Sequence, residues 1–186
     1  GRHQSAELLR PEEVAAHVVL QVGAPVQPDR AGDVGLGVEA GILVDLDDFR
    51  RINDLGGHAA GDQALLEIAD LLRSCVRSCD TVARLGSDEF VILLAELEHA
   101  PAAEQVAAKI LTTLHTPLAF QGSRNPLSTS IGVAVFPEDA RSAASLIEMA
   151  DARMYRAKRR GGQRIESRDR TPAGTPSRPA PDFLHH

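Results

Sequence analysis

The chain has 186 residues, of which 43% are hydrophobic and 25% charged, and a formal net charge of −6. This length allows one domain with a core and short tails, and the composition is that of an ordinary globular protein. The acidic balance argues against a nucleic-acid polymer as partner, but not against a nucleotide, which needs only a few local cations.

The first 38 residues give few signs of regular structure. Residues 23–37 include two prolines and four glycines, a composition typical of loops. We interpret residues 1–38 as an atypical, partly irregular lead-in. The continuous apolar run over residues 41–46 that follows is typical of a short strand buried on both faces.

An amphipathic helix is predicted for residues 59–79, because apolar side chains recur there at spacings of three and four. The chain's two cysteines, Cys75 and Cys79, lie on this helix as small apolar residues, since a zinc site or a disulfide scaffold needs more of them. Reduced cysteines favour a cytoplasmic location. No apolar run in the chain approaches the ~20 residues of a membrane span.

Two apolar runs, 81–85 and 89–94, flank a turn that contains glycine and therefore predict a hairpin. A second helix is expected over residues 102–115. Residues 127–136 predict a strand, which we expect to pair with one around residues 118–121.

The last predicted helix covers residues 142–160. Ser142 can cap its start, and Gly161 and Gly162 stop it. The prolines and the lack of an apolar period after it predict a disordered C-terminal tail over residues 167–186.

The order of these elements, β-α-α-β-β-α-β-β-α, mixes hairpins with crossovers. It predicts an α+β fold in which helices flank an antiparallel-rich central sheet, rather than a doubly wound sheet. We place this domain at residues 39–166.

The run Asp45-Leu46-Asp47-Asp48 follows the buried strand and is the first candidate for chemistry. A strand end holds its side chains in fixed positions, and Mg²⁺ takes hard oxygen ligands from one or two carboxylates together with water and phosphates. The alternative is an acidic, solvated strand end.

The turn Gly86-Ser87-Asp88-Glu89-Phe90 is the second candidate. Two adjacent acids in a hairpin turn repel each other, so a cation between them and the preceding strand end would stabilise the arrangement. Gly86 would let the backbone approach a phosphate. An ordinary turn has a similar composition, so this alternative stays open.

Two further groups have the chemistry of nucleotide binding. Asn53 and Asp62 offer donors and acceptors that match a guanine edge, although a loop between helices with an acid in the first turn is an alternative. The cations that end the last helix, Lys158 among them, either bind phosphate or only complement the helix dipole.

In this order and at this spacing, the groups resemble the successive motifs of GGDEF domains, over residues 40–166. The resemblance rests on five segments: 42–54 (ILVDLDDFRRIND), 57–62 (GHAAGD), 84–90 (RLGSDEF), 130–134 (SIGVA) and 150–158 (ADARMYRAK). It implies a palm-like nucleotidyl cyclase fold.

In this family two domains meet face to face, each with one GTP, and join them into cyclic di-GMP with release of pyrophosphate. The resemblance therefore implies a diguanylate cyclase with a Mg²⁺ or Mn²⁺ site made by the Asp45 carboxylate, the Leu46 carbonyl and the Asp88 carboxylate. Asp88 is then also the catalytic general base, and Glu89 completes the acidic pair. The residues expected to bind substrate are Asn53, His58, Asp62, Gly86 and Lys158.

The segment Arg77-Ser78-Cys79-Asp80 resembles the inhibitory product site of the family. Arg77 and Asp80 would bind cyclic di-GMP there, since the planar guanidinium suits guanine and phosphate edges. A charged helix end is the alternative. The resemblance also implies a homodimer and an adjacent sensor or phosphodiesterase domain.

Three features depart from the family pattern. Ser87 stands where the second glycine of the signature turn is usual. The basic residue expected one turn beyond the phosphate-binding lysine falls near Gly162, so that Arg160 or Arg164 would have to replace it. The usual lead-in motif is absent from residues 1–38. Two functions therefore stay open: an active diguanylate cyclase, or a catalytically degenerate module that binds GTP or cyclic di-GMP as a regulatory sensor.

Overall fold

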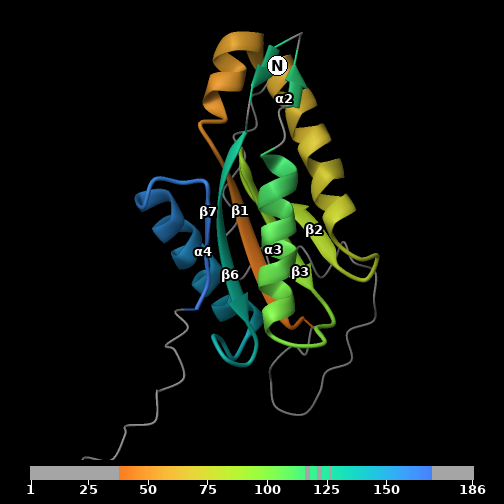
Figure 1. Ribbon diagram of the computed structural model, residues 1–186, viewed down its shortest axis with the longest axis vertical. Coiled ribbons are helices and arrows are strands. Elements are labelled where there is room, and N and C mark those ends of the chain that lie inside the picture. The colour runs from red at the N-terminus through yellow and green to blue at the C-terminus, as the bar shows by residue number, and fades with distance from the viewer. Residues whose placement is uncertain (1–37, 116–117, 121–122, 126, 169–186) are drawn as a thin grey trace, which may run out of the picture.

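A five-stranded sheet forms the centre of the molecule (Figure 1). The computed structural model describes residues 38–115, 118–120, 123–125 and 127–168. The sheet has the strand order β2-β3-β1-β6-β7, and its neighbours are antiparallel except for the parallel pair β6 and β7. Its strands are β1 Ala40–Asp47, β2 Thr81–Arg84, β3 Glu89–Leu94, β6 Ser128–Val135 and β7 Arg164–Glu166.

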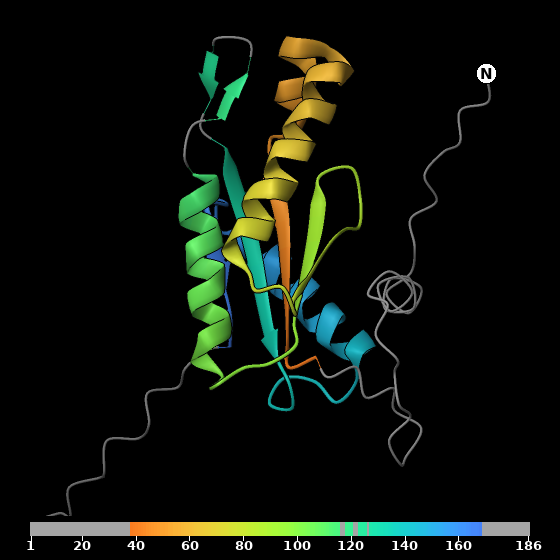
Figure 2. The ribbon, with the colours of Figure 1, turned by 90° about the vertical axis from the view of Figure 1, so that its right-hand side faces the viewer.

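Helices α2 (Arg50–Cys75) and α3 (Pro101–Leu114) cover one face of the sheet, and α4 (Ala143–Arg159) covers the other (Figures 1 and 2). Side chains alternate between the two faces of a strand. Ile42 therefore joins the core under α2 and α3, while Leu43 joins the core under α4. The predicted α+β class with flanking helices is confirmed.

Helix α4 lies unusually close to the sheet. A Cβ on Gly132 of β6 would overlap the carbonyl of Ala150 and the amide of Met154. Glycine at this point of β6 lets the helix backbone contact the strand directly. The predicted start of α4 is confirmed as well, because Ser142 accepts a hydrogen bond from the Ser145 amide as its N-cap.

Helix α2 bends at Gly57, whose φ of +78° is the left-handed conformation that favours glycine. This kink produces the two helical segments expected between the first two strands. The predicted end at residue 79 is wrong, because the helix stops at Cys75 and Val76 is extended. The Asp80 carboxylate instead accepts a hydrogen bond from the Arg77 amide at 2.9 Å, which favours a turn over continued helix.

The predicted pairing of residues 127–136 with a strand around 118–121 is also wrong. Strand β4 (Leu118–Phe120) pairs with β5 (Ser123–Asn125) in a separate two-stranded sheet. Strand β6 lies between β1 and β7, where its long buried stretch is covered on both edges. Strand β7 was not predicted, since three residues are too short for a periodic signal.

Residues 1–37 of the predicted lead-in and residues 169–186 of the predicted tail lie outside the described residues. Within the described residues, the helices are too short or too polar for a membrane span.

Candidate active site

The end of β1 holds a carboxylate in the interior. Asp45 is only 2% exposed, and antiparallel pairing sets it directly beside Glu89 of β3 and Ser130 of β6. Directly paired residues share one face of a sheet, so Asp45 and Glu89 lie together on the face covered by α4. Asp88 comes just before β3, and its carbonyl accepts a hydrogen bond from the Leu46 amide at 3.1 Å. The structure therefore brings these segments together.

Lys158 approaches the same point from the last turn of α4. Its Nζ lies 2.6 Å from Asp45 Oδ2, and its side chain is 39% exposed. A cation is therefore held where the two strands present their acids, with one side open to solvent.

The pKa values of this cluster show an excess of negative charge. Burial, and then the charges of Asp88 and Asp47, raise the pKa of Asp45, although the hydrogen bond and charge of Lys158 oppose this. Burial and the charge of Asp45 raise the pKa of Glu89. Burial lowers the pKa of Lys158, but the hydrogen bond and charge of Asp45 outweigh it, so the lysine pKa lies above its ordinary value. One lysine does not balance these acids, and a further cation would stabilise the ionised cluster.

The signature turn between β2 and β3 is held by an arginine. Arg84 Nε and Nη2 donate to the carbonyls of Gly86 and Ser87 at 2.8 Å and 2.9 Å. Arg84 stands shortly before the turn in the sequence, but no role for its guanidinium was predicted from the sequence. This contact fixes the backbone on which Asp88 and Glu89 sit.

Ser87 fits into this turn without strain. Neither Gly86 nor Ser87 is among the described residues with positive φ, so the backbone here does not demand glycine. The Ser87 hydroxyl donates to Asp88 Oδ1 at 2.7 Å. The departure from the usual signature thus adds a hydrogen bond to the carboxylate beside it.

The predicted guanine-binding residues lie around the kink in α2. Asn53 packs so closely on Gly61 that a Cβ there would overlap Asn53 Oδ1. Asp62, the next residue, lines a groove of about 300 Å³ between α2 and β2. The structure thus places Asn53 beside the residue that precedes Asp62, while His58 follows the kink on an exposed stretch.

The predicted product-binding residues, Arg77 and Asp80, lie in the loop before β2, at the far end of that strand from the signature turn. The Asp80 carboxylate accepts from the Arg77 amide at 2.9 Å and from the Ala95 amide at 3.2 Å. The Arg77 side chain is 62% exposed, and its Nη2 lies 3.8 Å from Glu98 Oε1. The loop is therefore fixed while the guanidinium is open to a ligand.

The basic residue expected beyond Lys158 has no clear replacement. Gly162 has a φ of +66°, and a Cβ on it would lie 2.7 Å from Asp47 Oδ2. Arg160 is bound to Glu166 at 2.9 Å and 3.0 Å. Arg164 donates from Nε to the Gly162 carbonyl at 3.3 Å, and its side chain is exposed.

The donor set at the end of β1 suits a hard divalent cation. Asp45, Glu89 and Asp88 offer carboxylate oxygens, and the Leu46 carbonyl lies 3.4 Å from the Phe49 amide. In the part of the chain that the structure describes, no group of three or more His, Cys, Asp or Glu side chains is arranged to hold a metal by itself.

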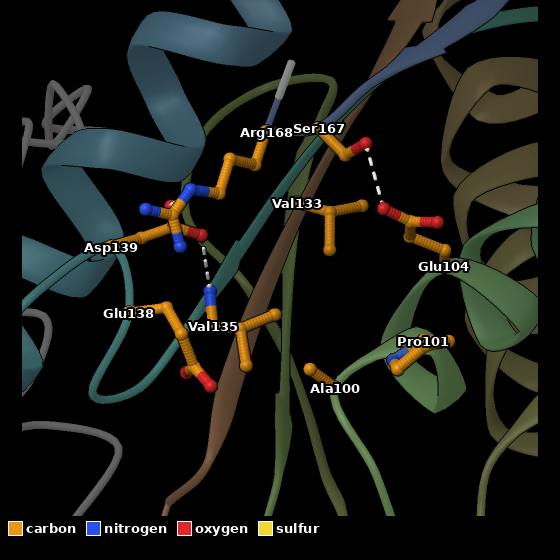
Figure 3. Close-up of a pocket in the computed structure, with 9 residues that line it drawn as sticks. All are labelled: Ala100, Pro101, Glu104, Val133, Val135, Glu138, Asp139, Ser167 and Arg168. Atoms are coloured by element: carbon orange, nitrogen blue, oxygen red, sulfur yellow. Dashed lines mark hydrogen bonds and ion pairs between the residues drawn. The ribbon is translucent and has the colours of Figure 1, made fainter. Parts of the chain in front are cut away.

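A second hollow lies at the opposite end of the sheet and includes none of the predicted site residues (Figure 3). It measures about 250 Å³, with Val133 and Val135 of β6 at its floor. Figure 3 shows Asp139 beside Arg168 on one side, and Ser167 bonded to Glu104 on the other. It is therefore separate from the carboxylate cluster.

Comparison with known proteins identifies the family. The model of the GGDEF domain of diguanylate cyclases matches residues 39–164. The chain belongs to the GGDEF diguanylate cyclase family.

The chain is similar to the diguanylate cyclase TpbB of Pseudomonas aeruginosa, with 43% identity over 127 residues. The match covers 67% of this chain and 29% of that protein. The crystal structure of the GGDEF domain of TpbB superposes with a TM-score of 0.66 at 41% identity, covering 69% of this chain and 80% of that chain. A microbial GGDEF domain described in an interaction with cyclic di-GMP has a TM-score of 0.62 at 29% identity, and the match covers 87% of this chain and 92% of that chain.

Proposed function

We propose that this domain is a diguanylate cyclase that condenses two GTP molecules into cyclic di-GMP and pyrophosphate, at the interface of two copies. The observation that carries the proposal is the cluster of Asp45, Glu89 and Lys158, in which two carboxylates have raised pKa values around one cation. Phosphoryl transfer depends mainly on positioning and on charge stabilisation, and such a cluster supplies both.

The Asp45 carboxylate, the Leu46 carbonyl and the Asp88 carboxylate would hold the metal of this reaction, Mg²⁺ or Mn²⁺. When bound, it neutralises the charge of the triphosphate and lowers the pKa of the attacking hydroxyl. A cation held there would also relieve the repulsion between Asp45 and Glu89, whose pKa values are raised by burial and by neighbouring acids.

The other residues act directly on the nucleotide. Asp88 accepts the proton of the 3′-hydroxyl as general base, with Glu89 beside it. Lys158 binds a phosphate oxygen from the end of α4, and Gly86 lets the backbone of the turn come close to the triphosphate. Asn53 and Asp62 bind the guanine edge at the kink of α2, with His58 nearby.

Product binding at Arg77 and Asp80 would inhibit the domain. The exposed Arg77 guanidinium and the fixed loop support this, as does the likeness to a GGDEF domain described with cyclic di-GMP. Calorimetry with cyclic di-GMP should show lost binding in Arg77→Ala; unchanged affinity would refute the site.

A degenerate module that binds GTP or cyclic di-GMP without turnover is the second candidate. Ser87 in the signature turn is the observation that favours it. Against it stands the conformation of that turn, which does not require glycine.

One experiment separates the two candidates. The protein is incubated with GTP and Mg²⁺, and the nucleotides are resolved by chromatography. We expect cyclic di-GMP from the native chain and a loss of about 10²- to 10⁴-fold in Asp88→Ala, the usual range for removal of a general base. GTP binding without product, at concentrations that allow two copies to meet, would favour the sensor.

A further inference from the structure

Asp47 has no part in the proposed reaction, yet its carboxylate is the most heavily bonded acid near the site. Oδ2 accepts from Ser128 Oγ at 2.6 Å, and Oδ1 accepts from Ser130 Oγ at 2.7 Å. Oδ2 also accepts a hydrogen bond from the backbone amide of Gln163 at 3.1 Å. An ionised carboxylate has about four acceptor sites, so three of them are already used inside the protein.

These bonds join three segments that are far apart in the chain. Asp47 ends β1, Ser128 and Ser130 begin β6, and Gln163 lies in the turn that connects α4 to β7. In that turn the backbone of Gly162 packs directly on the carboxylate, since a Cβ there would lie 2.7 Å from Asp47 Oδ2.

The turn is also held from its other side. Gln163 Nε2 lies 2.8 Å from Nδ1 of His115, the residue that follows α3. Gln163 itself has a φ of +50°. The chain after α4 is therefore fixed between the end of β1 and the end of α3.

This attachment bears directly on Lys158, which lies on the last turn of α4 before the fixed segment. Asp45 and Asp47 are two residues apart on β1 and so lie on the same face, about 7 Å from each other along the strand. Asp45 contacts the Lys158 ammonium, while Asp47 contacts the backbone just beyond the same helix.

We propose that Asp47 is a positioning residue, which fixes the C-terminal end of α4 so that Lys158 stays on Asp45. Its effect on nucleotide binding rests on the proposed function of the site, whereas its effect on the turn does not. The same geometry argues against Asp47 as a metal ligand, because its oxygens are already bound.

The test uses Asp47→Asn, Lys158→Met and the double variant, with Asp70→Asn as a matched control on the exposed face of α2. Ser128→Ala is a milder variant, which removes one of the three hydrogen bonds and should keep the fold if Asp47→Asn does not. The first measurement is amide hydrogen exchange of residues 158–164 without nucleotide. We expect faster exchange in Asp47→Asn, an intermediate rate in Ser128→Ala and no change in Asp70→Asn.

The second measurement is the affinity for a non-hydrolysable GTP analogue with Mg²⁺. We expect Asp47→Asn to weaken it by about 10- to 100-fold, the range for loss of a hydrogen bond to a charged group such as the proposed contact of Lys158 with phosphate. In the Lys158→Met background the same substitution should have less than about a twofold effect, because residues that act through one another are not additive.

Each outcome decides between named possibilities. Unchanged exchange of residues 158–164 in Asp47→Asn and Ser128→Ala would overturn the proposal. Additive losses of affinity in the double variant would show that Asp47 acts directly on the ligand instead. If the native chain does not bind the analogue at all, the proposed function fails, and hydrogen exchange still decides the role of Asp47.

Discussion

Helix α4 makes two ion pairs with buried aspartates, one at each end of the sheet, and they differ in kind. At one end, Arg153 donates to both oxygens of Asp139 at 2.6 Å and 2.8 Å. At the other end, Lys158 lies 2.6 Å from one oxygen of Asp45. The first pair is closed to solvent, with side chains 7% and 5% exposed, whereas Lys158 is open on one side.

The pKa values separate the two aspartates. Burial raises the pKa of Asp139, but hydrogen bonds from Arg153 and from the Val135 amide outweigh it, so the pKa lies below its ordinary value. Asp45 is buried among other acids, and its pKa is raised. A carboxylate whose bonds are all satisfied stabilises the fold, while one that is left short of positive charge is ready for a ligand.

Breaking the closed pair should have the largest effect. Arg153→Met keeps most of the side-chain volume but leaves the Asp139 charge buried, which typically costs about 3–5 kcal/mol of unfolding free energy. Urea unfolding measures this loss. In Arg73→Met, which breaks the pair with Asp70 in which both side chains are exposed, we expect no more than about 1 kcal/mol.

The pH dependence of that loss follows from the sign of the shift. Because the pKa of Asp139 is lowered in the folded state, its stabilisation is fully present above the ordinary carboxyl pKa. It disappears as the pH falls through the lowered value. The native chain and Arg153→Met should therefore converge in acid, and a constant difference down to pH 2 would contradict this account.

The sequence predicted more about the open pair than about the closed one. Asp45 lies at the end of a continuous apolar run, and Asp88 and Glu89 stand in a turn between two others, so their meeting follows from one strand pairing. Asp139 lies in no candidate motif, and Arg153 lies within the segment 150–158 but was assigned no role there. The one hint was a charged residue on the apolar face of α4, next to Met154.

The failures of prediction concern long-range pairing and side-chain bonds. The apolar pattern of β6 indicates a strand but does not say which strand lies beside it, and its neighbours β1 and β7 are distant in the chain. The end of α2 depends on the Asp80 carboxylate, which accepts hydrogen bonds from the backbone amides of Arg77 and Ala95. Both features arise from contacts that a local window of sequence does not contain.

Breaking the open pair should affect binding more than stability. Lys158→Met removes the proposed phosphate contact, and hydrogen bonds to charged groups contribute about 1.5–3 kcal/mol, so kcat/KM for GTP should fall about 10- to 100-fold. Steady-state assays of pyrophosphate release measure it. Arg159→Met, which removes the same charge one residue further on, should keep its activity. A larger loss of stability than in Arg153→Met would reverse the distinction between the two pairs.

Removing the charge of Asp45 should stabilise the fold, whereas breaking the closed pair should destabilise it. Because burial and neighbouring acids raise the pKa of Asp45, its ionisation opposes folding at neutral pH. Asp45→Asn should therefore unfold at a higher temperature than the native chain at pH 7.5, while its activity is lost. The gain should shrink as the pH falls through the raised pKa, where the native carboxyl is also neutral. A lower melting temperature at pH 7.5 would show that the contact with Lys158 outweighs burial.

The smallest effect is expected at the residue that departs from the family signature. Ser87 adopts a backbone conformation open to any residue, and its hydroxyl donates to Asp88 at 2.7 Å. Ser87→Gly restores the usual turn but adds backbone freedom, which costs about 0.5–1 kcal/mol at most. We expect cyclic di-GMP synthesis to change by less than about fivefold, because Arg84 continues to hold the carbonyls of residues 86 and 87.

An increase of a hundredfold would instead show that Ser87 suppresses the reaction, and the chain would then be better described as a sensor. The comparison of the two aspartates bears on the same question, because Asp45, unlike Asp139, lies in a cluster of acids that is short of positive charge.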